Sequence, residues 1–159
     1  MRRFVLIVAL FAAAACSPAE QTTTAPTDDA LPVPPEIAAV VSAAMPGVSI
    51  TSGASDGAGE YEVTGTLDGN EYEFDLLGPE GGWRVAEVQR DIAWGDAPQA
   101  VRDLVATSPG AFLPERVIES AQPGDGGIVY ELFAPGAPEA PSLEVRYFDG
   151  EAAVVPPAH

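Results

Sequence analysis

The chain has 159 residues and carries 24 Asp and Glu against 7 Lys and Arg, a formal net charge of −17. This length allows one domain, or two small lobes that share a core. The negative charge argues against binding to nucleic acid or to an anionic bilayer surface, because both attract cationic patches. It leaves basic proteins and cations as electrostatic partners, or a charge that serves solubility alone.

The first 16 residues have the pattern of a signal peptide. Arg2 and Arg3 precede an apolar run over residues 4–11, and four alanines then lead to Cys16. The run is shorter than the roughly 20 residues of a membrane-spanning helix. Small residues directly before a lone cysteine resemble the lipobox of bacterial lipoproteins, in which the thiol is acylated and the chain is cut before it. We therefore expect residues 1–15 to be a lipoprotein signal peptide and Cys16 to be the lipidation site.

The lone cysteine favours lipidation over an ordinary secretory cleavage or an uncleaved anchor, which remain the alternatives. An exported chain with one thiol forms no internal disulfide, so the thiol is modified, paired between molecules or reactive. Ser17 resembles an outer-membrane rather than an inner-membrane sorting signal. The mature chain, with no lysine and a net charge of −19, is predicted to be anchored by lipid on the periplasmic side of the cell envelope.

Residues 16–34 are rich in Pro, Thr, Ala and acidic residues and contain almost no large apolar side chain. Such a segment buries too little apolar surface to fold, so we predict a disordered tether. A coil of this length spans about 25 Å, which would hold the folded part away from the membrane. The last four residues, 156–159, are predicted to be disordered as well.

The folded part contains an internal repeat. Residues 35–47 align without a gap to residues 98–110, because both segments begin with Pro, run for eleven residues and stop at Pro-Gly. Proline in the first turn and a Pro-Gly stop are typical of helix ends. One short amphipathic helix is predicted in each copy from apolar residues at helical spacing, namely Ile37, Val40 and Val41, then Val101, Leu104 and Val105.

Each helix is followed by runs of β-branched and aromatic residues bounded by turn residues, which predict strands. Asp68-Gly69 and Asp149-Gly150 are typical two-residue hairpin turns. In the stretch 83–94 the apolar residues change from odd to even positions, which indicates a bulge or bend. The predicted strands are residues 48–51, 60–67, 71–77 and 83–94 in the first copy, and 116–121, 128–133, 143–148 and 151–155 in the second.

These elements predict an α+β fold built from two tandem helix-plus-antiparallel-sheet repeats, residues 35–94 and 95–155. The helices are expected on one face of the sheet, because an antiparallel sheet has one apolar face to cover. The sequence leaves open whether the two repeats join in one continuous sheet.

The duplicated unit resembles the PepSY-like and β-lactamase-inhibitor-protein-like family of bacterial periplasmic proteins. The resemblance rests on residues 35–47 with the Tyr-Glu-Val segment at 61–63, and on residues 97–110 with the Tyr-Glu-Leu segment at 130–132. It implies a small binding module outside the cytoplasm, without catalytic residues, of a kind proposed in some cases to restrain enzymes such as peptidases. An insertion over residues 135–142 departs from the family pattern by lengthening one hairpin.

The side chains that most catalytic sites require are scarce. The single histidine is the last residue, His159, so the sequence offers no Ser-His or Cys-His pair and no Cys/His zinc set. Composition alone allows the paired carboxylates of a glycosidase, but no motif supports them. The acidic turns at residues 56–60 and 68–71 lack the EF-hand spacing of calcium ligands. We therefore predict no catalytic residue, no metal site and no cofactor.

One constellation stands out in the first repeat. If Asp68-Gly69 closes a hairpin, alternation along both strands places aromatic and aliphatic residues on one face and acidic residues and threonines on the other. Like charges that face each other across strands destabilise a sheet by up to about 1 kcal/mol per pair. We predict that this face docks a basic protein or peptide, the alternative being a solvated surface, and its acidic residues are Glu60, Glu62, Glu71, Glu73 and Asp75.

The sequence thus predicts a membrane-tethered, non-catalytic binding module that recognises a protein or peptide. Two alternatives remain: an inhibitor or regulator of an envelope enzyme such as a peptidase, and a calcium-binding or passive envelope component. Nucleic acid is not expected as a partner, because the net charge repels it.

Overall fold

The computed structural model describes residues 32–57, 59–78 and 81–156. The predicted signal peptide, the lipidation site Cys16, most of the predicted tether (16–34) and His159 lie outside the described residues. Within the described ranges, none of the helices has the length and apolar character that a membrane span requires.

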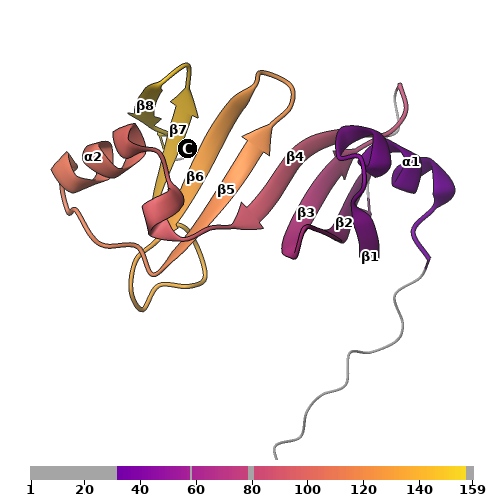
Figure 1. Cartoon of the computed structure of the whole chain (residues 1–159), viewed down its shortest axis with the longest axis horizontal. Coiled ribbons are helices and arrows are strands. Elements are labelled where there is room, and N and C mark those ends of the chain that lie inside the picture. Colours follow the sequence, from indigo (N-terminus) through magenta and orange to yellow (C-terminus); the bar gives the residue numbers. More distant parts are fainter. Residues whose placement is uncertain (1–31, 58, 79–80, 157–159) are drawn as a thin grey trace, which may run out of the picture.

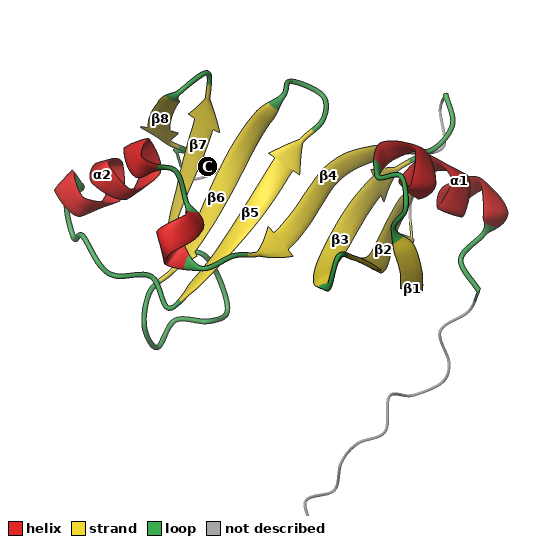
Figure 2. Cartoon of the chain, in the orientation of Figure 1, coloured by secondary structure: helices red, strands yellow, loops and turns green. Residues whose placement is uncertain are grey.

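The described residues form eight antiparallel strands in a single sheet, whose order in space follows the order in the chain (Figure 1). Two short α-helices lie at opposite ends of the sheet (Figure 2). In chain order the elements are α1 (Pro35–Ala44), β1 (Ser49–Gly57), β2 (Glu60–Leu67), β3 (Asn70–Leu77), β4 (Arg84–Asp91), the 3-10 helix η1 (Trp94–Asp96), α2 (Gln99–Thr107), β5 (Arg116–Gln122), β6 (Gly127–Phe133), β7 (Leu143–Phe148) and β8 (Glu151–Val154).

The predicted architecture of two tandem helix-plus-sheet repeats is wrong. The structure is mostly one eight-stranded antiparallel sheet, and the two α-helices have only 10 and 9 residues. The reason lies between β4 and β5, which pair from Val88 with Ala121 to Asp91 with Ile118. A separate first repeat would leave this side of β4 as an unpaired edge, whereas pairing with β5 satisfies its backbone groups.

Both Asp-Gly turns adopt the predicted hairpin geometry. Asp68 and Gly69 have φ of 52° and 82°, and Asp149 and Gly150 have φ of 49° and 85°. Positive φ at both central residues is what a type I′ turn requires, and the twist of this turn matches that of the flanking strands. The first turn lets β2 and β3 pair without a break along their whole length.

A bulge in β4 explains the change of phase in its apolar residues. Two adjacent residues of β3 pair with Val85 and Glu87, which leaves Ala86 as an extra residue in β4. Because of this extra residue, Val85 and Val88 face the same side of the sheet although one position is odd and the other even. The predicted bulge is confirmed.

One face of the sheet carries the apolar core, and both helices pack on it. Helix α1 buries Ile37 and Val41 against a cluster on β2 and β3, and α2 buries Val101 and Val105 against a second cluster on β5 to β7. The strand register puts both clusters on the same face, which we call the covered face. Its buried strand residues include Val63, Phe74, Leu76, Val117, Tyr130, Leu132 and Val145.

Strand β4 changes its partner along its length. Residues 84–89 pair with β3, whereas residues 88–91 pair with β5. Val88 and Gln89 are therefore the only residues of β4, all of which is described, that have a partner strand on both sides. Figure 1 shows β4 running from the strands near α1 to the strands near α2.

Candidate functional site

The face of the sheet opposite the core is covered by neither described helix and carries a large group of carboxylates. Glu62 of β2 lies directly opposite Asp75 of β3, and alternation along the two strands places the other predicted acidic residues on the same side. We call this side the acidic face. It contains all five predicted residues, Glu60, Glu62, Glu71, Glu73 and Asp75.

Three carboxylates form a row across neighbouring strands of the acidic face. Glu62 lies opposite Asp75, which in turn lies opposite Glu87 of β4. Directly opposed side chains of an antiparallel pair have Cβ atoms about 5 Å apart. On the other side of Glu62 lies Ala54 of the edge strand β1, so the row of carboxylates ends one strand before the edge of the sheet. Nε2 of Gln89 on β4 donates a hydrogen bond to Oδ2 of Asp75 at 3.4 Å.

The acidic face continues onto the second half of the sheet, which the sequence interpretation missed. Glu131 of β6 lies opposite Glu144 of β7, and the register turns both to the same side as the row. A signal for Glu131 exists in the sequence, because the Tyr-Glu-Leu segment at 130–132 corresponds to the Tyr-Glu-Val segment at 61–63. The sequence alone does not place Glu131 and Glu144 on the acidic face, because this placement depends on the sheet being continuous from β4 to β5.

Glu62, Glu73 and Asp75 form a dense part of the acidic face. One carboxylate oxygen from each residue lies within 4.8 Å of those from the other two. Burial, followed by the charges of Glu62 and Asp75, raises the pKa of Glu73, and the charge of Arg116 acts in the opposite direction. A carboxyl with a raised pKa is one whose charged form the surroundings disfavour.

Glu131 lies in a similar environment on the second half of the sheet. Burial raises its pKa, and the charges of Glu87 and Glu144 add to the effect. Asp75 raises this pKa further, although it lies on β3 and is separated from Glu131 by strands β4 and β5. The charge of Arg116 acts in the opposite direction, so charged groups from both halves of the sheet influence the pKa of Glu131.

The centre of the acidic face is buried although no described helix covers it. Ser120 is 0 % exposed and Ile118 is 8 % exposed. The hydroxyl of Ser120 donates a hydrogen bond to Oε1 of Glu87 and accepts one from Nε2 of Gln122 at 3.0 Å. These bonds satisfy the buried hydroxyl and connect Glu87 to β5. Side chains of β4 and of β5 itself thus engage the Ser120 hydroxyl at the centre of the acidic face.

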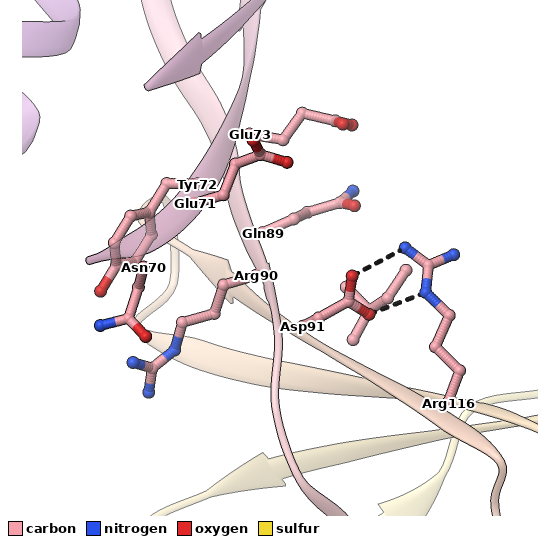
Figure 3. Close-up of a pocket in the computed structure, with 9 residues that line it drawn as sticks. Asn70, Glu71, Tyr72, Glu73, Gln89, Arg90, Asp91 and Arg116 are labelled. Atoms are coloured by element: carbon pink, nitrogen blue, oxygen red, sulfur yellow. Dashed lines mark hydrogen bonds and ion pairs between the residues drawn. The ribbon is translucent and has the colours of Figure 1, made fainter. Parts of the chain in front are cut away.

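A small cavity of about 160 Å³ lies where the ends of β3 and β4 diverge (Figure 3). Arg116 points toward Asp91 in this cavity, with its Nε and Nη2 atoms 2.7 and 3.1 Å from the two carboxylate oxygens. Arg90 forms an ion pair with Glu119 at 2.7 Å. Both arginines of the cavity are thus engaged by carboxylates outside the row.

This arrangement can attract and hold positive charge. Carboxylates form strong charge-assisted hydrogen bonds with lysine and arginine side chains. Calcium also prefers oxygen ligands but takes six to eight of them. With one oxygen each, Glu62, Glu73 and Asp75 supply three. Basic side chains therefore match the acidic face more closely than a tightly bound metal ion does.

No protein-family model, no curated protein and no solved structure matches the chain. The resemblance to the PepSY-like and β-lactamase-inhibitor-protein-like family therefore stays a prediction that rests on the sequence motifs.

Proposed function

We propose that the chain is a non-catalytic binding module whose acidic face docks a basic segment of a protein or peptide. The observation that supports this most directly is the row of Glu62, Asp75 and Glu87. Carboxylates that face one another across strands destabilise the free protein. Lysine or arginine side chains of a partner would place positive charge next to these carboxylates and offset their mutual repulsion.

The raised pKa values of Glu73 and Glu131 support the same proposal. Both values reflect surroundings that disfavour negative charge, and a docked cation would favour it instead. Hydrogen bonds between ionised partners are roughly twice as strong as neutral ones. Docking a basic segment would therefore relieve an electrostatic cost that folding leaves in place.

We propose that the module acts outside the cytoplasm, as a lipoprotein held through Cys16 on the periplasmic side of the envelope, at the outer rather than the inner membrane. The proposal is supported by the signal-peptide pattern of residues 1–15 and by the lone cysteine that follows it. Cells fed a labelled fatty acid should incorporate the label into the wild-type chain, whereas Cys16→Ser should remain unlabelled and leave the membrane fraction.

The docking proposal is tested by reversing charge on the acidic face. The triple variant Glu62→Arg, Glu73→Arg and Asp75→Arg should lose the partner that crosslinks to the wild-type chain in cells, as identified by mass spectrometry. A matched control reverses three exposed acidic residues elsewhere, Glu36, Asp103 and Glu139. Both variants have the same net charge, so equal capture of the partner by both would end the proposal.

Two other functions remain as proposals. If the captured partner is an envelope enzyme, such as a peptidase, the chain is its inhibitor or regulator, and adding the purified chain should lower the activity of that enzyme. The close approach of Glu62, Glu73 and Asp75 supports cation binding as a second candidate. Binding of calcium to the folded chain would raise the melting temperature with increasing calcium concentration.

A further inference from the structure

The two edges of the sheet differ in how accessible they are to another strand. Edge strand β8 has only four residues, is followed by Pro156, and packs Ala152 against the cluster that contains α2. Shortness, proline and a covering element are the usual ways in which a protein blocks an edge. Edge strand β1 has nine residues and contains neither proline nor a basic residue. The sheet is therefore closed at β8, whereas within the described residues no strand pairs with the outer side of β1, which we call the open edge.

The open edge has an unbroken stretch of four residues. Register shifts occur between Ile50 and Ser52 and between Ser55 and Gly57, but from Ser52 to Ser55 each residue pairs in sequence with one of β2. The shifts limit where a new strand can pair. They leave Ser52 to Ser55 as the regular segment along which an extended peptide can add to the edge.

The open stretch lies at the end of the carboxylate row. On the acidic face, Ala54 lies opposite Glu62 and Ser52 lies opposite Thr64. Both β1 side chains are small, so they do not block a long side chain that reaches across them. A strand added beside β1 would lie about 4.8 Å from it. A lysine or arginine beside Ala54 would then extend over the alanine toward the carboxylate of Glu62.

We propose that the basic partner adds to the β1 edge as a ninth strand, with lysine or arginine at alternate positions directed to the acidic face. This inference rests on the proposed function, because it specifies how the basic segment binds. Backbone hydrogen bonds to residues 52–55 provide affinity, and the acidic face favours cationic side chains on its own side of the added strand, where the one beside Ala54 lies in line with the carboxylate row. The partner is therefore an extended segment and not a helix or a compact domain surface.

The test uses the full chain and two synthetic ten-residue peptides. One alternates lysine with threonine, and the other has the same composition with five lysines followed by five threonines. The alternating peptide should bind more tightly and slow amide hydrogen exchange in β1 but not in β8. Exchange is measured by mass spectrometry of peptic fragments and affinity by calorimetry.

Two substitutions with the same charge separate strand addition from general attraction. Ala54→Lys places a positive charge at the end of the row, where it should repel the incoming lysine. This variant should lower the affinity for the alternating peptide by about tenfold or more. Ala153→Lys places the same charge on the same face at the β8 edge, opposite Arg146, and should change affinity by less than about twofold. Both alanines are exposed, so both variants should fold.

The outcomes distinguish the two proposals. Protection of β1 amides with selective loss in Ala54→Lys supports strand addition. The contrary result is that both peptides bind equally, that the β1 amides stay unprotected and that the two variants behave alike. Strand addition is then wrong, while the docking function stands. If neither peptide binds and the partner from cells still tolerates the triple charge reversal, both proposals are wrong.

Discussion

The covered face and the acidic face of this sheet are made by alternate residues of the same strands, but they have opposite energetic roles. On the covered face Val63 and Phe74 are 0 % exposed and pack beneath α1. The next residues along these strands, Glu62 and Asp75, face each other on the acidic face. The comparison teaches that burial on one face supplies the stability that allows like charges to be held together on the other.

The first prediction compares the loss of one aromatic ring from each face. Phe74→Ala removes a ring that is 0 % exposed on the covered face and should lower the free energy of unfolding by about 3–5 kcal/mol. Phe148 is 52 % exposed, and the guanidinium carbon of Arg146 lies 5.8 Å from the centre of its ring. Phe148→Ala should cost less than about 1 kcal/mol. Urea unfolding of the two variants measures both values, and equal losses would contradict the comparison.

The second prediction removes one charge from each face and expects opposite signs. On the covered face Glu119 accepts hydrogen bonds from Arg90 at 2.7 Å and from the Tyr130 hydroxyl at 3.1 Å. Glu119→Gln should therefore destabilise the protein by about 1–2 kcal/mol. Glu131→Gln on the acidic face relieves repulsion from Glu87 and Glu144 and should stabilise it by up to about 1 kcal/mol. Thermal and urea unfolding at pH 7 would show the two shifts, and the same sign for both would contradict this account.

The third prediction concerns pH and follows from the raised pKa values of Glu73 and Glu131. An unfolded glutamate has a pKa of about 4.3, so the folded state holds these two protons more tightly than the unfolded state does. Their contribution to stability is fully present below the unfolded pKa and is lost as the pH rises through the folded pKa values.

A double variant with Glu73→Gln and Glu131→Gln isolates this effect. It should be more stable than the wild-type chain at pH 7, and the difference between the two should shrink as the pH is lowered toward 4. The remaining carboxylates titrate in both proteins, so they largely cancel in the difference. A difference that stays constant over this range would show that the two glutamates are not responsible.

Features that depend on neighbouring residues could be predicted from the sequence. The two helices, both Asp-Gly turns and the bulge in β4 each have a local signal, namely proline and spacing, a dipeptide that tolerates positive φ, and a change of apolar phase. The division of β2 and β3 into an apolar and an acidic face followed from alternation alone. Local chemistry was therefore sufficient for the first half of the candidate site.

The pairing of β4 with β5 could not be predicted in the same way. A strand that ends a sheet and a strand with a partner on each side have similar local patterns, because the difference lies in backbone hydrogen bonds to residues far away in the chain. The duplicated segments at 35–47 and 98–110 suggested two units instead. Glu131 and Glu144 were missed for the same reason, since their place on the acidic face depends on this long-range pairing.

The change of partner along β4 has a mechanical consequence. Within β4 only Val88 and Gln89 are held by ladders on both sides, so we expect the sheet to twist more easily here than elsewhere. Twisting at this seam disrupts few backbone bonds and changes the separation between the carboxylates at Glu62 and Asp75 and those at Glu131 and Glu144. We therefore expect the two packed clusters, one on each side of the seam, to shift relative to each other more easily than either cluster deforms.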